Sequence, residues 1–187
     1  MLISGVSTIP GCLMLTVIRL AAAPDAVCLP AIERSAAQSF RAIESLSWLA
    51  DAEVMSVERH LQLIAWGTCW VAVDAAGQVQ GFLSAQMLDD DLHIHELSVA
   101  QVMQGRGAGR QLLEAVMNEA RSRRLRAVTL TTFCDVPWNS PFYQRLGFEQ
   151  AHSLAPDHRL AEALREEYRH GFAPGSRCAM SWQVVAR

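Results

Sequence analysis

The residues best suited to chemistry form one glycine-rich stretch, Gln104-Gly105-Arg106-Gly107-Ala108-Gly109-Arg110. It follows an apolar, strand-like run, 92–99, and opens a run with helical spacing, 107–123. Glycines at alternate positions let the backbone come close to a ligand. The N–H groups of such a loop and of the following helix start can converge on an anion, and the two arginines add positive charge. The stretch therefore predicts a site for a phosphate-bearing ligand.

Two common phosphate loops do not fit this stretch. A Walker loop needs a lysine, and the chain contains none. The dinucleotide fingerprint needs a third glycine at the position that Arg110 occupies. Gln104, Gly107 and Gly109 instead match the pattern Q-x-x-G-x-G, which resembles the acyl-CoA pyrophosphate loop of the GNAT superfamily of N-acyltransferases. The alternative is an ordinary glycine-rich turn between a strand and a helix.

A second motif lies further along the chain. Asn139, Tyr143, Gly147 and Phe148 stand in the segment NSPFYQRLGF. This segment resembles the GNAT segment that holds an asparagine, a tyrosine and a glycine-phenylalanine pair. The two motifs follow each other in the order found in the superfamily. Together they identify residues 13–185 as similar to the GNAT superfamily.

The rest of the sequence predicts the elements that position these motifs. Alternating apolar residues indicate strands, and apolar residues three or four apart indicate helices. The expected strands are 13–20, 68–73, 78–87, 92–99, 126–133, 148–149 and 178–185. The expected helices are 26–45 (broken), 53–66, 107–123 and 141–146. This order of elements is that of the GNAT superfamily.

Helical spacing also predicts which side chains face the core. In helix 53–66 these are Val54, Val57, Leu61 and Ile64, and in helix 107–123 they are Leu112, Leu113, Val116, Met117 and Ala120. The resemblance implies an α/β (α+β) architecture, the GNAT fold. Its central sheet is mixed but mostly antiparallel, with six to seven strands and flanking helices.

Length, composition and charge narrow the class of protein. With 187 residues, 51% of them hydrophobic, the chain suits one domain, expected over 13–187 behind a loose tail, 1–12. A net charge of −3 argues against a nucleic-acid binder. The apolar start, 1–15, is too short to span a membrane and lacks the basic residues of a signal peptide. Five scattered cysteines without a C-x-x-C pair favour reduced thiols and a cytoplasmic location.

The resemblance implies transfer of an acetyl group from acetyl-CoA, the co-substrate, to a primary amine. Such a reaction needs a base for the ammonium, donors for the oxyanion and an acid for the departing thiolate. In the superfamily the fourth strand is bulged and splays away from the fifth, which frees backbone N–H groups for the thioester and the pantetheine arm. The residues that the resemblance assigns to the co-substrate are Leu97, Ser98, Val99, Gln104, Gly105, Arg106, Gly107, Ala108, Gly109, Arg110 and Asn139.

Tyr143 is the candidate general acid, because a phenol is protonated at neutral pH and can donate to a thiolate. The alternative is a tyrosine that packs under the co-substrate with its ring. Asn139 has an amide that can hold the pantetheine arm, although an asparagine before Ser-Pro is also typical of a turn.

Glu96 is the candidate general base, because it is an ionisable residue in an apolar strand near the expected thioester site. His95 is its rival, since the ordinary pKa of histidine suits the task better, and water without a protein base is a third alternative. His93 and His95 are expected on the face opposite Glu96 if the strand is regular. A metal site built from the three residues is therefore disfavoured, and no metal is expected.

The acceptor is expected to be a small-molecule amine or an amino-acid-like molecule, with an N-terminal or lysine amine of a protein as the alternative. Trp48, Trp66, Trp138 and the acidic run 89–91 are candidates to line its site. A non-catalytic module that binds acyl-CoA is the competing class of protein.

The insert 150–177 is the part of the chain least fixed by the family pattern. It contains a helical run, 158–170, and long loops of this kind are often functional. It is expected to control the KM for the amine through its charged residues Arg159, Arg165, Glu166 and Glu167. The alternative is an arm that packs against the domain or forms a homodimer.

Overall fold

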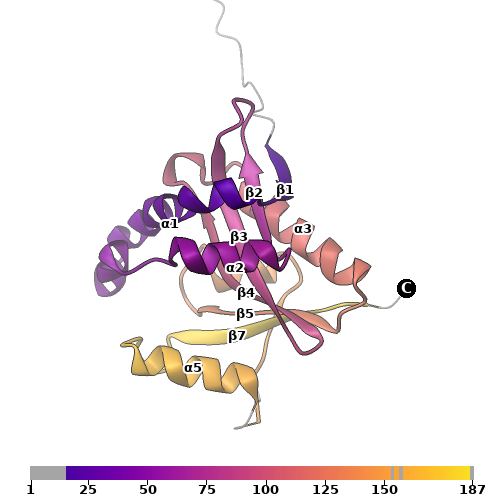
Figure 1. The fold of residues 1–187 in the computed structure, drawn as a ribbon. Coiled ribbons are helices and arrows are strands. Elements are labelled where there is room, and N and C mark those ends of the chain that lie inside the picture. Colours follow the sequence, from indigo (N-terminus) through magenta and orange to yellow (C-terminus); the bar gives the residue numbers. More distant parts are fainter. Residues whose placement is uncertain (1–15, 153, 156–157, 186–187) are drawn as a thin grey trace, which may run out of the picture.

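The computed structural model of the chain describes residues 16–152, 154–155 and 158–185, and its central feature is a seven-stranded sheet (Figure 1). The strands lie in the order β1-β2-β3-β4-β5-β7-β6. Their bounds are β1 Val17–Leu20, β2 Cys69–Val73, β3 Val79–Leu88, β4 Asp91–Val99, β5 Ala127–Phe133, β6 Glu149–Gln150 and β7 Arg177–Gln183. The expected tail, 1–12, and the start of the expected first strand, 13–15, lie outside the described residues.

Neighbouring strands of this sheet run antiparallel, except for β4 and β5, which are parallel. The predicted fold class, a mixed and mostly antiparallel sheet with flanking helices, is confirmed. The predicted hairpin is also present, with β2 and β3 paired across the turn that contains Gly77. The parallel pair matters for function, because the sheet opens there.

Helices cover both faces of the sheet. Their bounds are η1 Ala23–Val27, α1 Leu29–Ala37, η2 Gln38–Ala42, η3 Glu44–Asp51, α2 Val57–Ala65, η4 Gln101–Met103, α3 Ala108–Ser122, α4 Ser140–Gln144 and α5 Arg159–Arg169, where η marks a 3-10 helix. Successive residues of β3 separate two cores: Leu83 packs with α3, whereas Phe82 packs with residues of α1 and α2. The helix α3 therefore lies behind the sheet in Figure 1, and α1 and α2 lie in front. Across the described ranges, none of the helices combines the length and the hydropathy that a membrane crossing requires.

The expected helical run 26–45 is broken, as predicted. The chain forms η1, then the short α1, then η2 and η3. Two prolines explain the first break, because Pro24 lies in the first turn of η1 and Pro30 in the first turn of α1. A proline has no N–H to donate and is tolerated at the start of a helix but not in its interior.

The predicted inward face of α3 is confirmed, since all five expected side chains are buried. The inward face of α2 differs: His60 and Leu63 are its buried residues, and Leu61 is 38% exposed. The apolar pattern missed His60, whose ring packs edge-on against Phe82 with centroids 5.0 Å apart. Burial lowers the pKa of His60 to about 4, so the neutral imidazole serves as a core residue.

Candidate active site

The sheet opens between β4 and β5. These strands pair only where residues Asp91 to His93 meet Ala127 to Thr129, and they separate beyond that point, as predicted. Among the described strands, none pairs with this side of residues 94–99, so their backbone groups are available to a ligand. The junction is fixed by the buried carboxylate of Asp91, which accepts hydrogen bonds from Arg126 and Arg159, each at 2.8 Å.

A β-bulge at His95 lies at the edge of this opening. Ser84 of β3 pairs with Glu96, while the next residue, Ala85, pairs with Ile94. His95 is therefore an extra residue in β4 that has no counterpart in β3. A bulge of this kind redirects the side chains that follow it.

The bulge changes which face of β4 each side chain uses. Before it, Leu92 and Ile94 pack in the core under α3, and after it Leu97 and Val99 do so. In a regular strand Glu96 would share the face of Ile94 and would point into that apolar core. Because the extra residue shifts the alternation by one position, Glu96 points away from α3 and into the opening.

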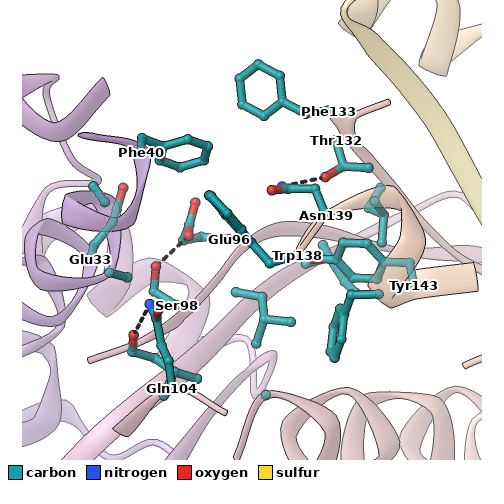
Figure 2. A pocket seen from close by; sticks show the side chains of 18 of the residues that line it. Glu33, Phe40, Glu96, Ser98, Gln104, Thr132, Phe133, Trp138, Asn139 and Tyr143 are labelled. Atoms are coloured by element: carbon teal, nitrogen blue, oxygen red, sulfur yellow. Dashed lines mark hydrogen bonds between the residues drawn. The ribbon is translucent and has the colours of Figure 1, made fainter. Parts of the chain in front are cut away.

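A pocket of about 660 Å³ occupies the opening (Figure 2). Its walls come from α1, the connection from α1 to α2, β4, the glycine loop, β5, α4 and the insert. The predicted site residues that line it are Glu96, Leu97, Ser98, Val99, Gln104, Gly105, Gly107, Ala108, Gly109, Arg110, Asn139 and Tyr143. Arg106, which was also predicted to bind the co-substrate, is exposed and lies outside the lining.

The glycine loop presents open backbone to the pocket. Gly105 and Gly107 are left-handed, with φ of +74° and +90°. Apart from the adjacent residues in the chain, no described residue has an atom within 4 Å of the position where either would carry a Cβ. The helix α3 begins at Ala108, and no described side chain caps its first turn. The N–H groups of that turn can therefore bind an anion. Arg110 and Arg145 line the same pocket. Arg110 is paired with Glu114 at 2.7 Å, and Arg145 adds positive charge.

Gln104 holds the glycine loop in place. Its Nε2 donates to the carbonyl of Val99 at 3.1 Å, and its Oε1 accepts from the hydroxyl of Ser39 at 2.9 Å. The side chain thus joins the loop to the end of β4 and to η2. Since both ends of the amide are bonded within the protein, we interpret Gln104 as a residue that positions the loop.

Asn139 offers an acceptor that the protein itself does not use. Its Nδ2 donates to the hydroxyl of Thr132 at 2.8 Å, but its buried Oδ1 has no hydrogen-bond partner among the described residues. A buried oxygen without a partner is energetically costly, and an amide N–H of a ligand would satisfy it. The open loop and this oxygen fit the phosphates and the amide groups of an acyl-CoA.

Tyr143 lies on α4, and Figure 2 shows it across the pocket from Glu33. Its ring is buried against Phe142 and Phe148, with centroid distances of 5.2 and 5.6 Å. Burial raises the pKa of Tyr143, and the nearby charge of Glu96 raises it further. The phenol therefore stays protonated throughout the neutral range and is available as a proton donor.

Two carboxyl groups line the same pocket, Glu96 from β4 and Glu33 from α1 (Figure 2). Glu96 accepts a hydrogen bond from the hydroxyl of Ser98 at 2.7 Å, and Glu33 accepts one from the backbone N–H of Met55 at 3.2 Å. Burial raises the pKa of Glu96. Burial, and after it the charge of Glu96, raises the pKa of Glu33 to about 8. Each carboxyl group therefore binds a proton more tightly than an exposed carboxyl group does.

The two histidines of β4 are less suited to the role of base. The expectation that they lie opposite Glu96 is wrong, because the bulge places Glu96 on the face of His93 and His95. His93 is buried, with Nδ1 3.0 Å from the hydroxyl of Thr129, and Nε2 of His95 lies 3.0 Å from Oε1 of Gln86. Burial lowers the pKa of His93 to about 3 and that of His95 to about 4. The described residues contain no group of three or more His, Cys, Asp or Glu side chains arranged to hold a metal ion.

Sequence reasoning missed Glu33, although a signal was present. Glu33, Ala36, Ala37 and Phe40 all line the pocket. Their spacing of i, i+3, i+4 and i+7 marks one face of a helix, and a single carboxylate in that small and apolar stripe is unusual. Other missed lining residues come from separate segments, so no local pattern joins them; among them are Phe133, Arg145, Phe172 and Arg177.

Several candidates for the acceptor site lie elsewhere. Trp138 lines the pocket, whereas Trp48 and Trp66 do not. The acidic run 89–91 is also outside the lining. Its last residue is held by two arginines at the junction of β4 and β5, so the run has a structural function.

The insert contributes aromatic and basic side chains to the pocket, in place of the expected charged set. Arg159 is bonded to Asp91 at 2.8 Å, which contradicts the expectation that its charge serves the acceptor. Phe172 and Arg177 are the residues of the insert that line the pocket. Glu167 acts indirectly, because its carboxylate accepts two hydrogen bonds from Arg177, at 2.9 and 2.7 Å.

Solved structures of N-acetyltransferases share this fold. PaiA N-acetyltransferase from Thermoplasma acidophilum, in complex with coenzyme A, has a TM-score of 0.66 at 17% identity, with 91% of this chain and 99% of that chain covered. The ribosomal-protein-S18-alanine N-acetyltransferase from Escherichia coli has a TM-score of 0.62 at 15% identity, with 92% and 96% covered. N-acetylglutamate synthase from Neisseria gonorrhoeae, complexed with coenzyme A and N-acetyl-glutamate, has a TM-score of 0.63 at 19% identity, with 92% and 36% covered.

A profile of the acetyltransferase (GNAT) family matches residues 32–148. The match spans more than half of the chain, which therefore belongs to this family. Membership confirms that the chain is an N-acetyltransferase and that acetyl-CoA is its co-substrate. The matched segment includes both motifs and Glu33, but it ends before the insert that carries Phe172 and Arg177.

Proposed function

We propose that the chain transfers the acetyl group of acetyl-CoA to the primary amine of a small molecule, with Glu96 as general base and Tyr143 as general acid. The observation that carries this proposal is the bulge at His95, which brings Glu96 into one pocket with Tyr143 and the glycine loop. The loop and the start of α3 would hold the phosphates, and Oδ1 of Asn139 would accept an N–H of the pantetheine arm.

Bound acetyl-CoA supplies an activated thioester carbonyl. A carboxylate oxygen of Glu96 takes a proton from the acceptor ammonium and leaves the nitrogen with a lone pair. Backbone N–H groups of residues 97–99 stabilise the negative charge that develops on the carbonyl oxygen. As the C–N bond forms and the C–S bond breaks, Tyr143 gives its hydroxyl proton to the sulfur. The nitrogen loses two protons in total. The first goes to Glu96, which releases it to solvent, and the second goes to the phenolate of Tyr143 and restores its hydroxyl.

The shape of the pocket favours a small acceptor. Its volume of about 660 Å³ is shared by two substrates, and its walls come from both sides of the open sheet. A concave site of this size buries most of a small molecule. This supports the proposal over acetylation of a folded protein surface.

The proposal predicts amine-dependent release of free thiol from acetyl-CoA. In an assay over small amines, amino acids and short peptides, Glu96→Gln should lower kcat by about 10²–10⁴-fold, because it keeps the shape of the side chain and removes its basicity. His95→Gln is the matched control on the adjacent residue and should retain most of the activity. The opposite result would transfer the base to His95, and turnover of peptides alone would contradict a small-molecule acceptor.

Gly107→Val should abolish measurable binding of acetyl-CoA in calorimetric titration. The side chain would enter the open space over the loop, where the phosphates are proposed to lie. Gly77→Val is the matched control, because Gly77 is also left-handed, with φ of +79°, and also has open space around its Cβ position. Both variants carry the same backbone strain, but only Gly107→Val should lose the co-substrate. Near-native affinity in a folded Gly107→Val protein would overturn the assignment of the loop.

A further inference from the structure

The pocket has a second end, which is lined by four aromatic side chains. We call Phe40, Phe133, Trp138 and Phe172 the aromatic wall, and all four line the pocket. Ring centroids are 5.6 Å apart for Phe40 and Phe133, 5.8 Å for Phe40 and Trp138, and 5.5 Å for Phe133 and Phe172. The rings therefore form one continuous surface, to which η2, β5, the loop after β5 and the insert each contribute one ring.

The aromatic wall lies away from the phosphate-binding loop. Figure 2 shows Phe40 and Phe133 on one side of Glu96, and Gln104 of the glycine loop on the other. An acyl group that reaches Glu96 from the loop leaves the wall to the second substrate. The wall is thus placed to contact the acceptor and not the phosphates of the co-substrate.

The wall leaves apolar surface uncovered. Trp138 is 43% exposed although it lines a concave site beside other rings. Exposed aromatic surface gathered at a pocket is typical of a site that an apolar ligand covers. The occupant of this end therefore has an apolar body.

Arg177 packs against the aromatic wall and makes this end of the pocket unfavourable for an acceptor that carries a second charged group. Its guanidinium lies 4.5 Å from the ring centroid of Phe133 and 5.0 Å from that of Phe172. Glu167 accepts two hydrogen bonds from this guanidinium, at 2.9 and 2.7 Å, so the charge of Arg177 is already paired and is a poor site for an acceptor carboxylate. The paired guanidinium also offers no acceptor to a second ammonium, because its N–H groups are all donors.

The two carboxyl groups lie where the wall meets the acyl-transfer site. Figure 2 shows Glu33 and Glu96 below Phe40, from α1 and β4. An ammonium between them makes charge-assisted hydrogen bonds, which are among the strongest in proteins. Glu96 is the proposed base, and Glu33 would hold the ammonium beside it.

We infer that the acceptor is a primary amine on a single aromatic or comparably apolar body, with its ammonium between Glu33 and Glu96 and its body against the aromatic wall. This inference rests on the proposed acetyl transfer and names the class of its acceptor. Glu33 and the wall are then the residues that determine specificity. The main alternative acceptor is a diamine, because Glu53 also lines the pocket and is exposed, so its carboxylate could bind a second ammonium.

The test compares three primary amines: 2-phenylethylamine with an aromatic body, ethylamine with a minimal body, and 1,4-diaminobutane with a second ammonium. Burial of a phenyl group against the wall should raise kcat/KM for 2-phenylethylamine about 100-fold over that for ethylamine. The kcat/KM for 2-phenylethylamine should also exceed that for 1,4-diaminobutane. Binding of each amine to the protein saturated with coenzyme A is measured in parallel by calorimetry.

Substitutions in the aromatic wall distinguish a direct contact with the acceptor from a general loss of activity. Phe40→Leu and Trp138→Leu should each reduce the ratio of kcat/KM for 2-phenylethylamine to that for ethylamine, by about tenfold. Trp66→Leu is the matched control, since Trp66 is also exposed but lies outside the pocket lining. It should leave the ratio unchanged. A ratio that does not respond to either wall variant would overturn the assignment of the wall.

The outcomes distinguish this inference from the proposed function. Preference for the diamine or for ethylamine overturns the inference, while acetyl transfer stands. Binding of 2-phenylethylamine with no transfer to any amine supports the acceptor site and overturns the proposed reaction. Absence of both binding and transfer for 2-phenylethylamine overturns the inference whatever the other amines do.

Discussion

Tyr143→Phe is expected to lower kcat by about 10²–10⁴-fold, the range for loss of a general acid. The dissociation constant of acetyl-CoA should stay nearly unchanged, because the ring that remains keeps its packing against Phe142 and Phe148. The fold should also be retained, since the change removes a buried hydroxyl and leaves no partner unsatisfied. Single-turnover thiol release with saturating co-substrate and amine measures the effect on the chemical step itself.

Tyr168→Phe is the control for this prediction, because Tyr168 is the only other tyrosine in the chain. Its hydroxyl donates to the carbonyl of Arg177 at 3.3 Å, outside the pocket lining. This variant should keep most of the wild-type kcat. If Tyr143→Phe also keeps more than half of the wild-type kcat, the role of Tyr143 is packing and the acid must be sought elsewhere.

Glu33→Gln is expected to reduce kcat/KM for the amine about 10- to 100-fold, the cost of one hydrogen bond to a charged group. The change should appear mainly in the KM of the amine, while the affinity for acetyl-CoA stays constant. The physical reason is that a bound ammonium favours loss of the proton from the Glu33 carboxyl and then makes a charge-assisted hydrogen bond to it. The substituted amide keeps the shape of the side chain and can accept the bond from Met55, but it cannot become charged. An unchanged KM for the amine would remove Glu33 from the acceptor site.

The same variant should become more stable relative to wild type as the pH rises. Burial raises the pKa of Glu33 from 4.5 to about 8, so the folded protein binds a proton that the unfolded chain has lost. The contribution of Glu33 to stability is therefore complete below pH 4.5 and is lost as the pH rises toward 8. Between pH 4.5 and pH 7 the unfolding free energy of Glu33→Gln should gain up to about 3 kcal/mol over wild type, at about 1.36 kcal/mol per pKa unit.

The unfolding free energies of Glu33→Gln and wild type are measured by urea titration at each pH. Glu58→Gln is a control whose stability should change with pH in the opposite direction. Glu58 lies in the first turn of α2, where backbone and Ser56 hydrogen bonds lower its pKa. Its contribution to stability is present above the ordinary pKa of glutamate and lost below it, so Glu58→Gln should lose stability relative to wild type as the pH rises. A Glu33→Gln curve that runs parallel to wild type across this range would show that the Glu33 carboxyl is not held in an unfavourable environment.

The sequence by itself determined the order of the elements, and it predicted the proposed phosphate-binding loop and the candidate pair Glu96 and Tyr143. These features depend on short-range properties of the chain. Alternation and helical spacing reflect local backbone geometry, and Gly107 marks a left-handed turn within its own loop. The buried face of α3 was predictable for the same reason, because its apolar residues repeat along a single uninterrupted helix.

Only the tertiary structure decided how these residues meet. The face of β4 on which Glu96 lies depends on the bulge at His95. A bulge exists only relative to the partner strand, where the adjacent residues Ser84 and Ala85 pair with Glu96 and Ile94. The position of Glu33 depends on where α1 crosses β4. The four rings of the aromatic wall come from three stretches that are distant in the chain, at residue 40, residues 133–138 and residue 172. Strand register and packing between segments are long-range properties, so the proposed acceptor site became visible only when the sheet, the helices and the insert were assembled.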